Sequence, residues 1–356
     1  MSGAVRIGEQ LIGPGHRPLV VAEMSGNHNQ SLERALAIID AAAQAGADAV
    51  KIQTYTADTM TLDSGERGFR IEDANSLWRG KNLYQLYKEA HTPWDWHAPL
   101  FERCKAHGML GFSSPFDASA VDFLETLGVP CYKIASFENT DLPLIRKAAA
   151  TGKPLIISTG MASEEELRDS VEAARQAGCR NLVLLKCTST YPATCDNTHL
   201  RTIPDMAQRF SCLVGLSDHT AGIGAAVASV AMGAVLIEKH FTLRRADGGV
   251  DSEFSLEPHE LKSLVVESGR AWQALGAVHY GPTAAEEQSL AYRRSLYVVA
   301  DMQPGEVLTP QNLRSIRPGH GLPPRFYDEV LGKPVAKAVK RGTPLSWELV
   351  NAKGKS

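Results

Sequence analysis

The chain has 356 residues and a formal net charge of −3, with 44% hydrophobic and 22% charged residues. This composition is ordinary for a globular protein, and the length suits one large α/β domain with a smaller one. The charge provides no basic field for nucleic acid or an anionic membrane, so we expect neither as a partner.

The N-terminal residues, the lack of a long apolar stretch and the pattern of cysteines predict the cellular compartment of the protein. Residues 1–6 lack the apolar core of a signal peptide, and no stretch approaches the roughly 18 apolar residues of a membrane span. The six cysteines are scattered, without a C-x-x-C pair. We therefore expect a cytoplasmic, reduced protein without disulfides or a structural zinc site.

Short β-branched runs alternate with longer amphipathic segments, which is typical of βα units in a parallel sheet. The runs are Leu19–Ala22, Ala49–Ile52, Leu110–Phe112, Cys131–Ile134, Leu155–Ile157, Leu182–Leu185, Leu213–Leu216 and Val235–Ile237. Helices are predicted over residues 32–45, 118–127, 164–177, 223–232 and about 256–275. Ser31, Thr92 before Pro93, and Ser163 before an acidic turn are predicted helix N-caps.

The number and spacing of these runs predict the architecture. Eight βα units with polar residues at their carboxyl ends favour a (β/α)8 TIM barrel over the alternative, a doubly wound open sheet. One connection, between the second and third strands, is about twice as long as the others and is rich in aromatic residues; such long loops are usually functional. We expect a TIM-barrel catalytic domain over 1–280, a linker over 281–293, and a small β-rich domain over 294–356.

Polar residues end almost every predicted strand. In a barrel the carboxyl ends of the strands surround one shared site. The resulting ring contains Glu23, Lys51, Gln53, Ser113, Ser114, Lys133, Ser136, Ser158, Thr159, residues 186–189, Ser217, Asp218, His219, Glu238, Lys239 and His240.

Lys51 and Lys133 interrupt apolar strands, where an unpaired charge is costly. Two ammonium groups with nearby hydroxyls form a clamp for phosphate or carboxylate. The alternative is that a lysine pairs with Glu23 or Glu238 as part of the scaffold.

His219 and His240 end adjacent strands at the same rim, and neutral imidazoles suit a divalent ion such as manganese. The pair would also serve in hydrogen bonding or acid/base work. Glu23 could position water or move a proton, or pair with a lysine. His28, on the first loop, is either a site residue or a loop-ordering one. No G-x-S-x-G, Walker or complete G-x-G-x-x-G motif follows a strand.

The chain resembles the bacterial sialic acid synthase family across nearly its whole length. The resemblance is carried, in order, by residues 21–29 (VAEMSGNHN), 51–54 (KIQT), 113–116 (SSPF), 132–136 (YKIAS), 157–161 (ISTGM), 187–192 (CTSTYP), 215–220 (GLSDHT) and 237–242 (IEKHFT). Residues 317–321 (RPGHG) resemble the antifreeze-like (SAF) domain that ends these enzymes.

The resemblance implies roles for individual residues. Phosphoenolpyruvate would be bound by Lys51, Ser114, Lys133, Ser136 and Ser217. His219 and His240 would hold a divalent metal, Mn²⁺ or Mg²⁺, and Glu23 would handle the attacking water or a proton. Gln53, Tyr191 and Asp251 would lie on the sugar side. Ser189 is a further predicted substrate-binding residue, at a position where the chain departs from relatives that carry a larger polar residue. Arg317 would reach into a partner's barrel, which implies a domain-swapped homodimer.

Residues 25–29 (SGNHN) of the first loop, and residues 54–60 (TYTADTM) and 91–97 (HTPWDWH) of the long connection between the second and third strands, resemble the pseudaminic acid synthase branch. The expected activity is a transferase reaction that condenses phosphoenolpyruvate with open-chain 2,4-diacetamido-2,4,6-trideoxy-β-L-altropyranose and water, giving pseudaminic acid and phosphate. The alternatives are an N-acetylneuraminic or legionaminic acid synthase, or another aldol-type synthase that uses phosphoenolpyruvate and a phosphorylated sugar. A protein of another class, an inactive sugar-binding or regulatory protein, would lack phosphate release.

Overall fold

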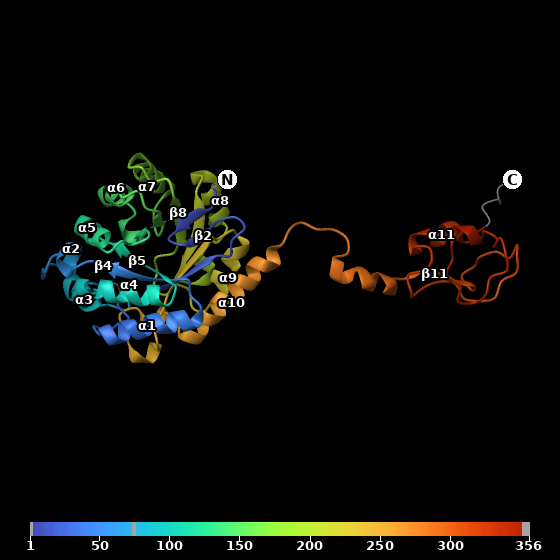
Figure 1. Cartoon of the computed structure of the whole chain (residues 1–356), viewed down its shortest axis with the longest axis horizontal. Helices are drawn as coiled ribbons and strands as arrows, with labels where there is room; N and C mark the ends of the chain where they lie inside the picture. Colours follow the sequence, from blue (N-terminus) through green and yellow to red (C-terminus); the bar gives the residue numbers. More distant parts are fainter. Residues whose placement is uncertain (1–2, 73–75, 351–356) are drawn as a thin grey trace. The chain divides into compact units, whose positions relative to one another are not determined.

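The computed structural model describes residues 3–72 and 76–350, and Figure 1 shows its elements in chain order. The chain divides into two compact units, residues 1–276 and 277–356. The first two residues of the predicted barrel domain and the last six of the predicted small domain lie outside the described residues.

The first unit contains a closed barrel of eight parallel strands in the order β10-β3-β4-β5-β6-β7-β8-β9. Hydrogen bonds between β9 and β10 and between β10 and β3 complete the ring, so the predicted TIM barrel is confirmed. The strands are β3 (Leu19–Glu23), β4 (Ala49–Thr54), β5 (Leu110–Pro115), β6 (Tyr132–Ile134), β7 (Leu155–Ser158), β8 (Leu182–Cys187), β9 (Leu213–Asp218) and β10 (Leu236–His240).

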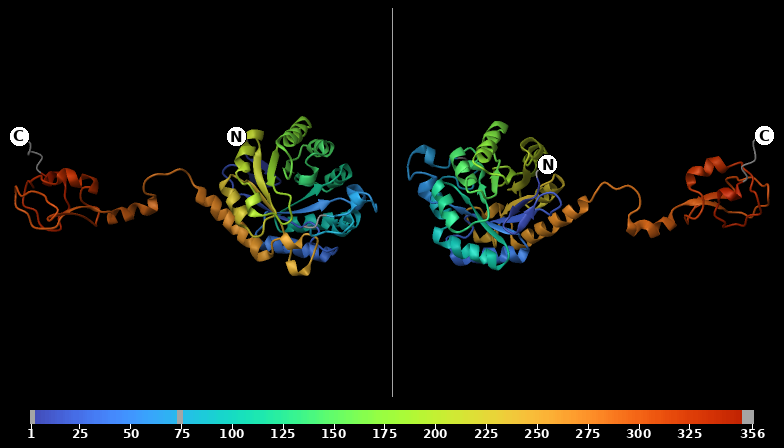
Figure 2. Two further views of the ribbon diagram at one scale, coloured as in Figure 1. Left: turned by 180° about the vertical axis from the view of Figure 1, so that it is seen from behind. Right: turned by 45° about the horizontal axis from the view of Figure 1, so that its top comes forward.

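Helices surround these strands (Figure 2). The Ser31 hydroxyl accepts a hydrogen bond from the Arg34 N–H at the start of α1, and Ser163 forms a capping box with Glu166 at the start of α7, so both predicted caps are present. The surrounding helices are α1 (Leu32–Ala45), α4 (His97–Ala106), α5 (Ala118–Thr126), α6 (Leu142–Ala149), α7 (Glu164–Gln176), α8 (Thr202–Phe210), α9 (Gly224–Ala231) and α10 (Pro258–Leu275).

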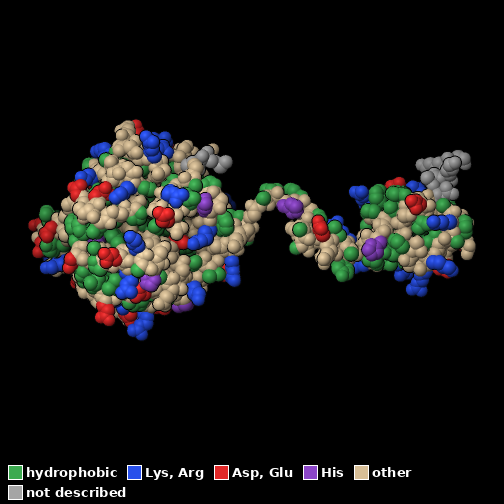
Figure 3. Space-filling view, in the orientation of Figure 1, with side chains coloured by type: hydrophobic (Ala, Val, Ile, Leu, Met, Phe, Trp, Pro, Cys, Tyr) green, Lys and Arg blue, Asp and Glu red, His purple; other side chains and the backbone are tan. Residues whose placement is uncertain are grey.

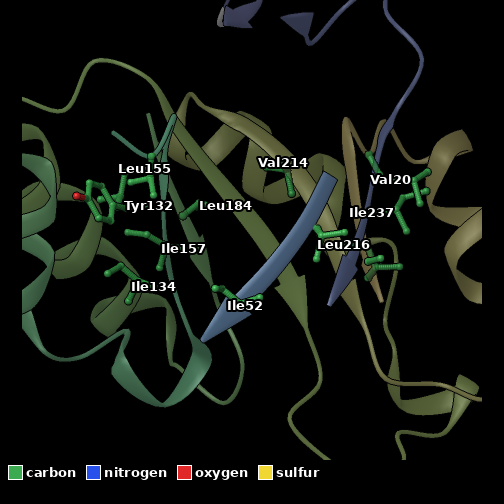
Figure 4. Close-up of a cluster of buried hydrophobic side chains, with 14 of the residues drawn as sticks. Val20, Ile52, Tyr132, Ile134, Leu155, Ile157, Leu184, Val214, Leu216 and Ile237 are labelled. Atoms are coloured by element: carbon green, nitrogen blue, oxygen red, sulfur yellow. The ribbon is translucent and has the colours of Figure 1, made fainter. Parts of the chain in front are cut away.

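Alternate residues of each strand belong to two different cores. Val20, Ile52, Ile157 and their counterparts pack against the helices (Figure 4). The residues between them, such as Val21 and Ile156, form a second cluster that fills the barrel. This division follows from the two-residue period of a strand, which sends successive side chains to opposite faces.

A hairpin that the sequence did not predict adds to the barrel interior. It consists of β1 (Val5–Ile7) and β2 (Gln10–Ile12), which pair in antiparallel register. Val5, Ile7 and Ile12 are buried in the same cluster as the interior strand residues. A strand of three residues is too short to show an alternation of apolar and polar residues. The sequence therefore did not predict this hairpin.

The long connection between β4 and β5 is an insertion with its own helices, α2 (Ala57–Met60) and α3 (Leu83–Ala90), and two 3-10 turns, η1 (Arg67–Phe69) and η2 (Trp94–Trp96). The predicted cap at Thr92 is wrong. The 3-10 turn η2 begins at Trp94 with Pro93 at its N-cap and without a side-chain cap, and the Thr92 hydroxyl instead lies 3.3 Å from Nε2 of the buried His28. The local Thr-Pro signal is overridden by this contact between distant segments.

The second unit contains a small antiparallel sheet of β11 (Ser295–Val298) and β12 (Leu313–Ile316), the short helix α11 (Tyr327–Val330), and its own apolar core. A 3-10 helix, η7 (Ala284–Tyr292), occupies most of the segment that we expected to link the domains.

Positive and negative side chains are interspersed on the face of the protein that Figure 3 shows. Within the described residues, no helix is long and apolar enough to cross a membrane.

Candidate active site

The carboxyl ends of the strands carry polar side chains on the positions that face the barrel interior. These positions have the same parity as the apolar residues of the interior cluster, so the polar groups continue that inner face toward the rim. Gln53 is half-buried. The others are buried: Glu23, Lys51, Ser114, Lys133, Ser158, Ser217, Glu238 and His240.

Four strand residues of the predicted ring have the opposite parity, among them Lys186 of β8, whose ammonium donates to the Cys187 carbonyl at 2.8 Å. The Lys239 ammonium lies 2.9 Å from Oδ2 of Asp218 and also donates to the carbonyls of Thr220 and Gly222. Ser113 Oγ lies 2.6 Å from the Thr54 hydroxyl, on the side of α4. Our placement of Ser113, Lys186, Asp218 and Lys239 in the shared site is therefore wrong. They hold the barrel wall together, because odd and even positions of one strand cannot face the same side.

Two ammonium groups and two carboxylates form the centre of the site. Lys51 Nζ lies 2.7 Å from Glu23 Oε2 and 3.2 Å from Ser114 Oγ. Glu238 Oε1 lies 3.7 Å from Lys51 Nζ and 3.4 Å from Lys133 Nζ. The lysines are thus charge-balanced within the barrel, and they converge on a common region where they could share an incoming anion.

Burial and charge shift the pKa values of this cluster in opposite directions. Burial raises the pKa of Glu23, and the Lys51 charge only partly opposes this. Burial also raises the pKa of Glu238, but Lys133 and Lys51 outweigh it and hold that pKa below its ordinary value. Glu23 is therefore the carboxylate that is better suited to accept and return a proton.

The two histidines lie side by side, with ring centroids 5.3 Å apart. His219 Nδ1 is 2.9 Å from the carbonyl oxygen of Thr188; because a carbonyl only accepts, this nitrogen carries the proton and Nε2 is left as the lone-pair donor. Burial lowers the pKa of His240 well below its ordinary value, and the charges of Lys51 and Lys133 act in the same direction, so this imidazole is neutral.

These features fit a divalent cation. Among the described residues, His240 Nδ1 is buried without a hydrogen-bond partner, and an orphaned ring nitrogen beside a second imidazole is a suitable ligand pair. No group of three His, Cys, Asp or Glu residues within 3–72 and 76–350 has the arrangement of a complete metal site. Two protein ligands would leave positions for water and substrate, as in a catalytic site.

Gln53 and Asp251 lie next to Glu23. The Gln53 amide donates to Glu23 Oε1 at 2.8 Å and to Ser25 Oγ at 3.0 Å, and Ser25 in turn donates to Asp251. Burial raises the pKa of Asp251 to about 6, with Ser25 opposing the rise. Ser25 therefore connects Gln53, on β4, with Asp251, in the loop after β10, through hydrogen bonds. Our sequence analysis did not single out Ser25.

Tyr191 and Ser189 follow β8 at the same rim. The Tyr191 ring lies 4.5 Å from the His219 ring and 5.2 Å from that of Phe254, between ring centroids. Ser136 Oγ and Ser189 Oγ lie 3.3 and 3.8 Å from the sulfur of Cys187, which connects them. Phe254, absent from our predicted site, lacks a polar signal in the sequence that could have marked it.

Arg317 is in the second unit, so its predicted entry into a partner's barrel stays a prediction. His28 is buried, accepts a hydrogen bond from the backbone N–H of Gln30 at 3.1 Å, and lies edge-on to Trp96. Of the two roles left open for His28, the contacts support ordering of the first loop.

Glu138, in the turn after β6, was also missed. Burial raises its pKa to about 7, although the Lys133 charge opposes the rise. Its Oε2 has no hydrogen-bond partner within the described part of the chain. Its position two residues after Ser136, at a strand end, was the available sequence signal.

Comparison with known proteins agrees with this geometry. The NeuB family model matches residues 38–280, and the SAF domain model matches residues 293–351. The chain belongs to the NeuB family.

Members of this family resemble the chain over most of its length. It is 45% identical to a pseudaminic acid synthase of Campylobacter jejuni, over 92% of this chain and 94% of the relative. It is 43% identical to a pseudaminic acid synthase of Helicobacter pylori, over 92% of this chain and 96% of the relative. The N,N'-diacetyllegionaminic acid synthase of Legionella pneumophila is 35% identical, with 94% of each chain covered.

Among solved structures, the N-acetylneuraminic acid (sialic acid) synthetase of Leptospira borgpetersenii matches with a TM-score of 0.73. The two chains are 32% identical, and the match covers 82% of this chain and 96% of that one. The barrel unit and the small unit thus match a family that includes several sugar-acid synthases.

Proposed function

We propose that this protein is a pseudaminic acid synthase, a transferase that condenses phosphoenolpyruvate with open-chain 2,4-diacetamido-2,4,6-trideoxy-L-altrose and water. The products are pseudaminic acid and phosphate. The observation that carries the proposal is the 43–45% identity to pseudaminic acid synthases across 92% of the chain, against 35% to a legionaminic acid synthase.

Lys51 and Lys133 would bind phosphoenolpyruvate. Their ammonium groups both approach Glu238 Oε1 from β4 and β6, so the phosphate and carboxylate of one small anion can contact both. Hydroxyls of Ser114, Ser136 and Ser217 would add neutral hydrogen bonds. Preorganised cations of this kind also stabilise the charge that moves onto the departing phosphate.

His219 and His240 would hold the metal, and their imidazole nitrogens suit Mn²⁺ better than Mg²⁺. When bound, the ion would polarise the aldehyde oxygen of the open-chain sugar as a Lewis acid. Gln53, Tyr191, Asp251 and Ser189 would contact the sugar, since each lies beside another group of the site: Glu23, His219, His240 and Cys187 respectively.

The reaction would form one carbon–carbon bond and one carbon–oxygen bond, from water to C2. It would break the carbon–oxygen bond between C2 and phosphate, while the former aldehyde oxygen takes up a proton. The C3 carbon of phosphoenolpyruvate attacks the aldehyde carbon, and water adds to C2. Glu23 accepts the proton released by this water, a role that its raised pKa supports. Collapse at C2 then expels phosphate into the Lys51 and Lys133 clamp.

We further propose a domain-swapped homodimer in which Arg317 of one chain enters the barrel of another. The surface supports this: Phe137, after β6, and Met161, after β7, are 61% and 59% exposed at neighbouring strand ends. Apolar side chains exposed beside a site suit a protein contact. We also place the enzyme in the cytoplasm, where phosphoenolpyruvate is produced.

A sugar panel tests the proposed activity. The protein would be incubated with phosphoenolpyruvate, Mn²⁺ and, separately, the altro-configured diacetamido sugar, its manno-configured relative and N-acetylmannosamine. Mass spectrometry should show a three-carbon gain with the altro sugar, together with released phosphate. Product from only the manno sugar or only N-acetylmannosamine would instead assign the legionaminic or neuraminic activity.

A further inference from the structure

The insertion between β4 and β5 extends to the far side of the site through Trp78. The Trp78 indole N–H donates to the carbonyl of Val250 at 2.8 Å, and its ring centroid lies 5.9 Å from that of Tyr191. Val250 immediately precedes Asp251. Trp78 thus joins the loops after β8 and β10, although it is more than a hundred residues from both.

Trp78 is the outer member of a continuous row of aromatic rings, which we call the aromatic wall: Trp78, Tyr191 and Phe254. Tyr191 contacts the His219 ring, and Phe254 lies edge-on to His240 with centroids 4.9 Å apart. The aromatic wall therefore runs from the two histidines to the half-buried indole. An open cavity of about 500 Å³, lined in part by Leu77, Trp78, Gly249 and Val250, borders its outer end.

The position of the indole is fixed by its surroundings. A Cβ on Gly26 would lie only 2.4 Å from Val250 Cγ2, so the first loop packs tightly against the residue that accepts the Trp78 hydrogen bond. Because its one N–H is already used, Trp78 offers a ligand only apolar ring surface. Such a surface contacts methyl and C–H groups favourably and leaves a sugar hydroxyl without a partner.

We propose that Trp78 is a specificity-determining residue that selects a sugar carrying methyl-bearing substituents over a more hydroxylated one. The inference rests on the proposed function and adds the residue that discriminates between sugar substrates. Lys51 and Lys133, on β4 and β6, form the anion-binding half, whereas the aromatic wall is built from the insertion and the loops after β8 and β10. Trp78 therefore acts on the sugar without affecting phosphoenolpyruvate.

The test compares Trp78→Ala, Trp78→Phe and Trp94→Phe. Trp94 is the matched control: it is on the same insertion and its indole N–H also donates to a carbonyl, that of Tyr55 at 3.3 Å, but its ring stacks on Phe123. Phosphate release would give KM and kcat for phosphoenolpyruvate, the diacetamido-trideoxy sugar and N-acetylmannosamine.

In Trp78→Ala, the preference in kcat/KM for the diacetamido sugar over N-acetylmannosamine should fall about tenfold or more. The KM for phosphoenolpyruvate should stay unchanged, Trp78→Phe should recover most of the preference, and Trp94→Phe should match the wild type. Equal losses with both sugars, or a raised KM for phosphoenolpyruvate, would overturn the inference while the proposed function stands. A wild-type protein inactive on every sugar would overturn both.

Discussion

The carboxylate of Glu238 lies 3.4 Å from the ammonium of Lys133, and both side chains are about 95% buried. The same oxygen is 3.7 Å from Lys51. Replacing Glu238 with Gln would leave two buried ammonium groups facing the single carboxylate of Glu23. We expect Glu238→Gln to lose about 3–5 kcal/mol of unfolding free energy, because one partner of a buried charge pair is gone.

Phosphoenolpyruvate should stabilise Glu238→Gln more than it stabilises the wild type, since the ligand supplies the missing negative charge. Thermal unfolding with and without phosphoenolpyruvate measures the difference. Glu125→Gln is the control, because Glu125 pairs with Lys153 at the surface, where such a pair contributes about 0–1 kcal/mol. An equal ligand-induced shift in wild type and Glu238→Gln would show that the lysines do not bind this anion.

His240→Ala should abolish turnover and weaken Mn²⁺ binding at least tenfold, because the ion would lose one of its two imidazole ligands. Titration calorimetry on metal-stripped protein measures the affinity, independently of activity. His259→Ala serves as the control, since its side chain is 74% exposed. Normal turnover by metal-stripped His240→Ala would contradict the proposed metal site.

His97 should make the protein less stable in acid. Burial lowers its pKa to about 4, outweighing hydrogen bonds to carbonyls of the Pro93 turn, whereas the unfolded value is near 6.5. The unfolded chain therefore binds the proton first as pH falls. The stability from neutral His97 is present above pH 6.5 and is lost between about pH 6.5 and 4, for a total of roughly 3 kcal/mol.

Urea unfolding at several pH values across this window tests the linkage. His28, whose pKa is also lowered to about 4, mainly by burial, contributes in the same direction. His97→Asn should therefore flatten the slope of unfolding free energy against pH without removing it, and His259→Asn should leave the slope unchanged. An unaltered slope in His97→Asn would refute the assignment.

Mixing two inactive variants tests the proposed dimer. Arg317→Ala should be inactive if its arginine completes a partner's site, and His240→Ala should be inactive through its own barrel. If subunits exchange freely, a 1:1 mixture should recover about a quarter of wild-type activity, because only one combination restores a whole site. A mixture that forms mixed dimers yet stays inactive would exclude this exchange of domains.

The sequence by itself was sufficient to predict the barrel and which polar residues lie at the carboxyl ends of its strands; the roles of those residues stay predictions. Eight β-branched runs separated by amphipathic segments determine the strand order, because parallel strands need crossover connections between them. Charged residues such as Lys51 and Lys133 within apolar runs marked the strand ends that carry chemistry. The family strings then assigned a role to each of them.

Only the tertiary structure decided which side of the wall each polar residue faces. Strands buried on both faces are apolar throughout, so their sequence has no alternation to identify the inner face. Lys239 was therefore grouped with Glu238 and His240, from which it points away. The position of Trp78 was equally hidden: closure of the barrel brings it to Tyr191 and Val250, and no periodic signal in a chain records a contact between loops so far apart in sequence.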